Sequence, residues 1–239
     1  DLKPVSGQLV WASSSKIAYD YGTAGTTDLA SLVNSLKQQE IYLIAQLSCC
    51  TDELMVTRCP SAALTLPGGI PYKDEDGSWL DPYNSMTADY LTELCTELAD
   101  MGFDELLLKN LAMPQTDATL AYTVQLSSVP NPVSAVCSLA IDLISQLESR
   151  DVLVSAILDT TSLRSGLSAQ SGQDLSVFAK LFDRLCCSAD TVWRATVDRD
   201  SVDYWMYEGD LSLRFVPIFP FADSGNFSCW IYKVPEGML

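Results

Sequence analysis

The feature that most constrains the fold is a regular alternation of helix-period segments with short, mostly apolar runs. After Asp28, which suits a helix N-cap, apolar residues recur at positions 29, 32, 33 and 36, and the run Ile41–Leu47 follows at once. Runs of this length are typical of strands buried on both faces. Helix–strand alternation predicts parallel strands joined by helical crossovers. The same unit recurs before expected strands at Glu105–Leu111, Val152–Leu158 and Thr191–Val197.

The connecting segments differ in length at the two ends of these strands. The helix-to-strand joins are one residue at Glu40 and about three at Met101–Asp104, whereas the loops 48–85, 112–132 and 159–173 are long. In barrels and doubly wound sheets alike, the carboxyl end of the strands carries the site. No glycine fingerprint opens a helix, which disfavours a nucleotide-binding doubly wound sheet. We therefore expect one domain over residues 1–239 with its site among these loops.

Three further segments carry local signals. Lys73–Trp79 indicates a turn between short strands, with Asp76 and Gly77 at its tip. Arg214–Pro220 is a strand candidate whose two prolines suit a sheet edge or the end of a strand. Before the strand expected at Thr191–Val197, Asp174 is expected to open a helix. That helix carries Leu175, Phe178, Leu181, Phe182 and Leu185.

Charge and residue usage exclude several kinds of function. The net charge of −17 opposes binding to nucleic acid, and no apolar run reaches the length of a membrane span. The chain has no histidine, which excludes Ser-His-Asp and Cys-His catalysis and imidazole metal sites. We expect no metal and no cofactor, and any acid–base chemistry must come from Asp, Glu, Lys, Tyr or Cys.

The eight cysteines lack CxxC spacing, so a zinc site is not expected. Cys95, Cys137 and Cys186 fall in helical patterns, where cysteine behaves as a small core residue. A Cys50–Cys59 disulfide stays open, because one sequence does not fix the pairing.

Five stretches of the chain follow a shared pattern in order and spacing, namely Asp1–Leu9, Gln39–Leu47, Trp79–Tyr83, Leu98–Leu106 and Gly172–Leu175. Together they resemble a known family, the α-amylase-like glycosyl hydrolase (β/α)8 barrels, of which this chain would be a divergent member. The resemblance implies a TIM-type barrel whose first βα unit and most of the second strand precede Asp1. It also implies a carbohydrate partner and an extracellular or cell-surface location.

The departures from the family pattern fall on its acidic positions. Where the family's fourth strand usually ends Phe-Asp-Tyr-Ile-Arg-Phe-Pro, this chain has Lys109 at the acidic position and Ala112 at the arginine position. Where the fifth strand usually reads Ser-Ala-Asp-Val, Ile157 replaces the acid. Glycoside hydrolysis generally needs two carboxyl groups about 5–10 Å apart, so the resemblance implies lost or relocated chemistry.

Asp159 and Asp198 are the best remaining catalytic pair. Asp159 lies two residues beyond Ile157 and so points the same way along a strand, and Asp198 follows the next expected strand. The alternative is that both are solvated loop acids or helix caps. Lys109 is a candidate substrate-binding residue, and the alternative is a barrel-mouth lysine paired with a nearby carboxylate.

The candidate substrate-binding residues have structural alternatives as well. Aromatic faces stack on sugar rings, so Trp79 and Trp193 are candidates, although for each alone packing in the core or a loop is the favoured explanation. Asp81 and Tyr83 keep a family motif but also suit a turn that seats the next helix. We expect a catalytically degenerate barrel that binds a glycan or serves as a scaffold. The alternatives are a glycosidase with relocated carboxylates, and an enzyme whose partner residues precede Asp1.

Overall fold

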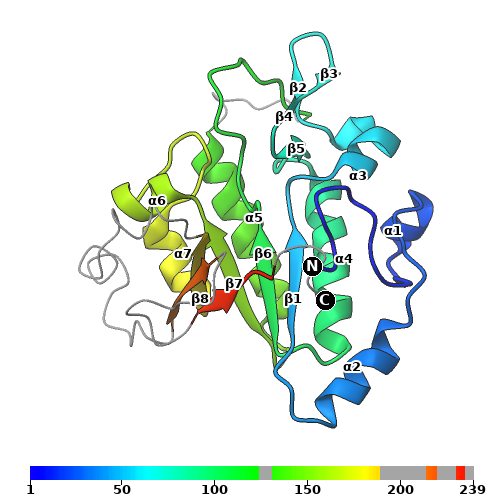
Figure 1. Ribbon diagram of the computed structural model, residues 1–239. Coiled ribbons are helices and arrows are strands. Elements are labelled where there is room, and N and C mark those ends of the chain that lie inside the picture. Colours follow the sequence, from blue (N-terminus) through cyan, green and yellow to red (C-terminus); the bar gives the residue numbers. More distant parts are fainter. Residues whose placement is uncertain (124–130, 189–213, 220–229, 235–239) are drawn as a thin grey trace.

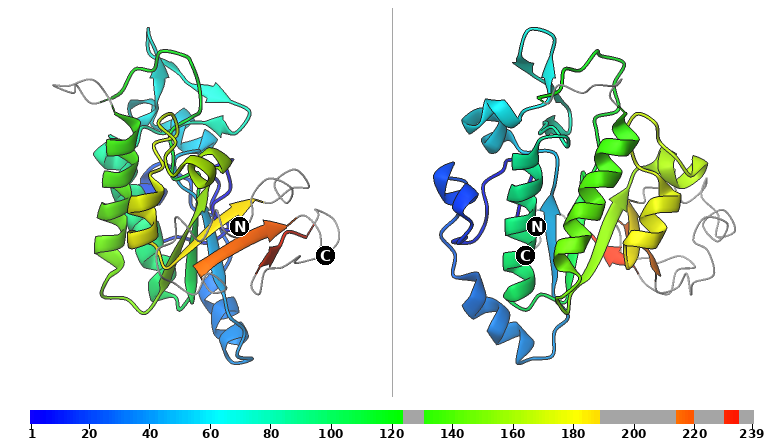
Figure 2. Two further views of the ribbon diagram at one scale, coloured as in Figure 1. Left: turned by 90° about the vertical axis from the view of Figure 1, so that its left-hand side faces the viewer. Right: turned by 180° about the vertical axis from the view of Figure 1, so that it is seen from behind.

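The computed structural model describes residues 1–123, 131–188, 214–219 and 230–234. A six-stranded sheet runs through it, and every neighbouring pair of its strands is parallel. The sheet curls, so that the β8–β10 side turns away from β1 and β6 (Figures 1 and 2). The strands in spatial order are β1 (Ile44–Ser48), β6 (Glu105–Lys109), β7 (Leu153–Leu158), β8 (Arg184–Ser188), β9 (Phe215–Phe219) and β10 (Ile231–Tyr232).

Helices cover one face of this sheet. Figure 2 shows α4 (Ser85–Asp100), α5 (Pro132–Leu147) and α7 (Leu175–Leu181) together on the convex side, with α2 (Leu29–Lys37) beside α4. The predicted start signals are confirmed, because the Asp28 carboxylate accepts from Ser31 N at 3.1 Å and Asp174 from Ser176 N at 2.9 Å. The remaining short elements are α1 (Lys16–Asp20), α3 (Glu53–Arg58), the 3-10 turn η1 (Pro60–Ala62), α6 (Thr160–Ser165) and the hairpins β2 (Thr65–Leu66) with β3 (Ile70–Pro71) and β4 (Lys73–Asp74) with β5 (Gly77–Ser78).

The two faces of the sheet differ in what they contact. Outward-facing Leu47, Leu108 and Ala156 join the main core against the helices. The concave face carries a smaller apolar cluster of Leu107, Cys186 and Val216. Register explains the split, since Leu107 pairs with Ser155 and successive residues of a strand point to opposite faces.

A polar network lies on the concave face near the amino ends of the strands. Glu105 is buried and forms an ion pair with Arg184, and Tyr42 donates to the Glu105 carboxylate at 2.8 Å. Ser155 donates to the other Glu105 oxygen, so this buried carboxylate is fully compensated.

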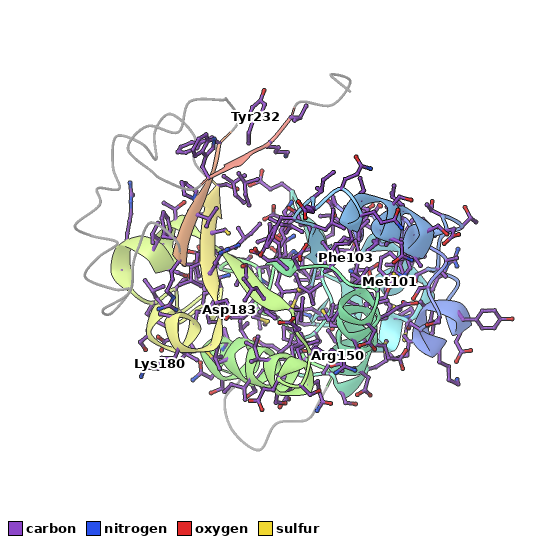
Figure 3. All side chains as sticks on the ribbon, turned by 90° about the horizontal axis from the view of Figure 1, so that it is seen from below. Met101, Phe103, Arg150, Lys180, Asp183 and Tyr232 are labelled. Atoms are coloured by element: carbon purple, nitrogen blue, oxygen red, sulfur yellow. The ribbon has the colours of Figure 1, made fainter. Side chains whose placement is uncertain are left out.

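The loop asymmetry expected from the sequence is confirmed. The long loops gather at the top in Figure 1, beyond the carboxyl ends of the strands. Figure 3, seen from below, labels Met101, Phe103, Arg150 and Asp183 at the short joins. In the α5–β7 join, Arg150 donates to Asp100 at the end of α4 at 2.9 Å. In the α7–β8 join, Asp183 accepts from Val154 N of β7 at 2.8 Å.

The boundary between α7 and the next strand was predicted wrongly. The helix ends at Leu181, and Leu185 and Cys186 belong to β8, whereas the sequence pattern placed both in the helix. Pairing with β7 overrides the helical period here, because Leu185 aligns with Ala156 and Cys186 with Ile157. The strand expected at Thr191–Val197 lies outside the described residues.

The strand expected at Arg214–Pro220 is confirmed as β9, but it is not at an edge. It lies between β8 and β10, with Pro217 opposite Cys187. The β10 pairing begins beyond the proline, at Ile218 and Phe219. A proline inside a sheet is tolerated where its missing N–H would not serve a ladder bond.

The expected parallel α/β architecture is confirmed, and its sheet curls into half of a barrel. The described ranges do not form a closed eight-stranded barrel. At the β1 edge, Lys3 forms a single parallel bridge with Leu47. Ser48 N donates to Lys3 O at 2.8 Å, so the first residues begin a further parallel pairing.

The first residues are also held by a buried ion pair. Lys3 Nζ lies 2.8 Å from Asp52 Oδ2, and both side chains are 0% exposed. The same ammonium donates to Ser48 O at 2.6 Å, while Asp52 Oδ1 caps α3 through Met55 N at 2.7 Å. Gly7 passes so close that a Cβ there would lie 1.9 Å from Asp52 Oδ1.

Cys50 and Cys59 are both buried free thiols, so the Cys50–Cys59 disulfide is not formed. Cys95 and Cys137 lie in the core as predicted. Among the described residues, no group of three or more His, Cys, Asp or Glu is placed to hold a metal ion. Nor does any helix in the described ranges have the length and apolar character needed to cross a membrane.

Candidate site at the carboxyl ends of the strands

A hollow of about 570 Å³ lies where β6, β7 and β8 end. The β4–β5 hairpin and the loop 166–174 close two of its sides. Its position is that of the site in parallel α/β folds generally. The described residues that line it are Asp74, Glu75, Asp76, Trp79, Lys109, Asn110, Ala112, Met113, Gln115, Ile157, Leu158, Asp159, Ser171, Gln173 and Ser188.

Lys109 is the last residue of β6 and lines this pocket. It pairs with Ser48 of β1, which places it on the concave face, and its side chain is half-buried. The expected pairing with a carboxylate is not found among the described residues, since none approaches its ammonium within 4.0 Å. The next residue, Asn110, has a φ of 53° and anchors the strand end by donating to Thr51 Oγ1 at 2.5 Å.

Asp159 lies in the same pocket, but both of its carboxylate oxygens are occupied. Oδ1 accepts from Ser162 N at 2.7 Å as the N-cap of α6, and Oδ2 accepts from the Ser171 hydroxyl. This is the helix-cap alternative that the sequence left open. Both oxygens of this carboxylate are therefore already engaged by donors of the protein itself.

Gln173 is a site residue that sequence reasoning missed. Its side chain is 2% exposed, and Nε2 donates to Ile157 O at 3.1 Å and Leu111 O at 3.3 Å. Its Oε1 accepts from Asp159 N at 2.8 Å. One amide thus joins the ends of β6 and β7. In the sequence, Gln173 shows only that it lies in a polar loop directly before the helix cap Asp174. That position does not indicate a role for its side chain.

The β4–β5 hairpin forms the acidic side of the pocket, and its predicted turn is confirmed. Trp79 follows the hairpin and is only 4% exposed, with its indole N–H donating to Asp74 Oδ1 at 2.9 Å. Because so little of the ring is exposed, Trp79 is better explained by packing inside the protein than by stacking on a sugar ring. Glu75 and Asp76 at the tip are exposed.

Asp81 and Tyr83 lie near the pocket but are not among the described residues that line it. Asp81 is 0% exposed and accepts from Tyr83 N at 2.9 Å and from Thr123 N at 2.7 Å. The Tyr83 hydroxyl accepts from Asn131 N at 3.0 Å, and its ring meets Tyr122 edge-on at 5.5 Å. Both residues therefore tie loops together ahead of α4 and α5.

The strand ends themselves carry few groups for acid–base chemistry. The concave positions at the ends of the first four strands are Ser48, Lys109, Ile157 and Ser188. Asp159 is the one predicted catalytic residue that the structure places in the pocket. Asp198 and Trp193, the other two candidates in this region, lie outside the described residues.

Comparison with known proteins supports the fold. Residues 1–189 match the model of a family described as "putative glycosyl hydrolase domain". No curated protein matches the sequence. A hypothetical protein from Ruminiclostridium thermocellum ATCC 27405 is similar in structure, with 22% identity, a TM-score of 0.58, and coverage of 65% of this chain and 80% of that one. The PgaB (BpsB) glycoside hydrolase domain from Bordetella bronchiseptica has 14% identity, a TM-score of 0.56, and coverage of 82% and 66% respectively.

Proposed function

Because this chain belongs to the family of putative glycosyl hydrolase domains, we propose that it binds a saccharide in the pocket at the ends of β6, β7 and β8 without hydrolysing it. The pocket's size suits a small ligand or one or two sugar rings. Its lining combines amide, hydroxyl and charged groups with apolar surface from Met113, Ile157 and Leu158, a mixture suited to the two kinds of surface on a sugar.

One observation carries the proposal, namely that the described strand ends do not present a pair of free carboxylates. Lys109 and Ile157 occupy the positions where the family resemblance expects acids, and neither donates and accepts protons as a glycosidase requires. Asp159 is committed to the cap of α6 and to Ser171. The other polar groups at the described strand ends can recognise hydroxyls but supply no second carboxylate.

An active glycosidase with relocated acids is the second candidate. The observation that favours it is the lining of the pocket, where Asp74, Glu75 and Asp76 share one hollow with Asp159. One of these acids would have to stand about 5–10 Å from Asp159 across the bound sugar. Asp159 with Asp198 is the other pair to test.

A glycan array and a panel of chromogenic glycosides separate the two candidates. For binding without turnover, we expect array signals that Ser188→Trp abolishes, because an indole at the end of β8 fills the pocket. Ser145→Trp, on the exposed side of α5, is the matched control. Absence of binding to any glycan contradicts the proposal.

Hydrolysis is the other arm of the same experiment. Turnover that is lost in Asp159→Asn but kept in Asp142→Asn, an exposed position on α5, would establish the enzyme instead. Asn keeps an acceptor for the α6 cap, so this variant tests chemistry rather than folding.

The finer assignments form part of the proposal. We propose an α-amylase-like barrel as the parent architecture and an extracellular or cell-surface location, supported by the motif order between residues 1 and about 200. Asp81 and Tyr83 then support the pocket indirectly, by fixing the loop that carries Trp79.

A further inference from the structure

The position of Lys109 bears on which saccharide the pocket takes. Its ammonium is the one cationic group among the described residues that line the hollow. The described part of the chain contains six ion pairs within 4.0 Å, and Lys109 belongs to none of them. By contrast, Lys3 at the β1 edge is fully buried and paired with Asp52.

Two carboxylates of the described lining already accept hydrogen bonds from other groups. Asp159 accepts from Ser162 N and from the Ser171 hydroxyl. Asp74 Oδ1 accepts from the indole N–H of Trp79 and from Asp76 N, each at 2.9 Å. Turning the Asp159 carboxylate toward Lys109 would break two existing hydrogen bonds, one at each oxygen.

The surroundings of Lys109 favour an incoming anion. Ile157 lies beside it on the concave face, and Met113 and Leu158 add apolar surface to the same hollow. A cation in a partly apolar hollow gains more from a carboxylate than it would in open water, because the effective dielectric constant is lower. A lysine acts as a point charge and needs no fixed bidentate geometry.

The acids at the rim limit how much negative charge a ligand can carry. Glu75 and Asp76 are exposed at the hairpin tip, and the whole chain carries a net charge of −17. A polyanion would be repelled by this field, whereas a ring with one carboxylate needs only the single cation at its base.

From this arrangement we propose that the pocket selects a saccharide with one uronic-acid carboxylate, which binds the ammonium of Lys109. The inference rests on the proposed function and specifies its ligand class. The neutral hydroxyls of the same ring would face the amide and hydroxyl groups of Asn110, Gln115 and Ser188.

The test compares uronic-acid oligosaccharides with their carboxyl-reduced, neutral counterparts by isothermal titration calorimetry. The wild-type chain should bind the acidic member of a pair about tenfold more tightly. Lys109→Met should remove this preference, and Lys109→Arg should retain it because the charge is kept. Lys180→Met loses the same charge from an exposed position near the end of α7 (Figure 3) and should leave the preference unchanged.

The outcomes separate this inference from the proposed function. Equal affinity for acidic and neutral members, or a preference that survives Lys109→Met, overturns the uronic-acid assignment while leaving saccharide binding intact. Failure of every member to bind, acidic or neutral, overturns the proposed function itself. Unchanged circular dichroism of the Lys109 variants shows that each result concerns a folded protein.

Discussion

The buried ion pair between Lys3 and Asp52 gives a prediction that the structure makes quantitative. Lys3→Met removes the ammonium but keeps most of the side-chain length in a site that is 0% exposed. The change leaves the Asp52 carboxylate buried with only the Met55 N–H of the α3 cap as a donor. It also leaves Ser48 O without its lysine donor.

The size of the effect follows from the two opposing terms. At 2.8 Å the direct attraction is about 6 kcal/mol for an effective dielectric constant of about 20. Removing both charges from water costs several kcal/mol per ion, so the intact pair contributes little net stability. Removing one partner keeps the desolvation of the other and loses the attraction, which predicts a loss of about 3–5 kcal/mol. That loss is a large part of the roughly 5–15 kcal/mol that holds a typical domain folded.

Urea unfolding of four proteins tests this reasoning as a double-mutant cycle. Lys3→Met and Asp52→Asn should each lower the free energy of unfolding, whereas the double variant should lose much less than their sum. Asn at position 52 keeps an oxygen for Met55 N, so the cap persists. A cost below about 1 kcal/mol for Lys3→Met, or strictly additive losses, would refute the ion-pair argument.

Three further predictions concern single groups. Gln173→Leu leaves the carbonyls of Leu111 and Ile157 without their donor, so urea unfolding should show a loss of about 1–3 kcal/mol; a change within about 0.5 kcal/mol would contradict this. Burial raises the pKa of Cys50 to about 12, so iodoacetamide at pH 8 should label this thiol only after denaturation, and rapid labelling in the native protein would contradict its burial. Burial, and then the hydrogen bond to Glu105, raises the pKa of Tyr42 to about 12 from an ordinary 10.0. Because the folded state favours the neutral phenol, this contribution to stability is complete below pH 10 and is lost as pH rises toward 12. Melting temperatures across that range should fall less steeply for Tyr42→Phe, and parallel curves would contradict the assignment.

The arrangement of elements could be predicted because it depends on local patterns. Period and length separated the helices from the strands, and Asp28 and Asp174 marked helix starts through the cap chemistry of a short carboxylate. The contrast between short joins and long loops then indicated the end of the sheet at which the pocket lies. At α7, however, the helical period continued through Leu185, and only pairing with β7 showed that this residue belongs to a strand.

The candidate site was only partly open to such reasoning. The sequence placed Lys109 and Ile157 at strand ends, since side chains alternate along a strand. It did not distinguish a catalytic Asp159 from a helix cap, because the two roles differ only in which donors approach the carboxylate. Nor did it identify Gln173, whose amide joins two strands through backbone carbonyls that carry no sequence signal.

By itself, then, the sequence determined the parallel α/β class, the end of the sheet that holds the pocket and the residue types at the strand ends. Only the tertiary structure decided which carboxylates accept hydrogen bonds from the protein and that the Trp79 ring is buried. It also showed that Lys109 forms no ion pair with the described acids. The physical reason is that local pattern sets direction and period, whereas partnership depends on distances between segments far apart in the chain.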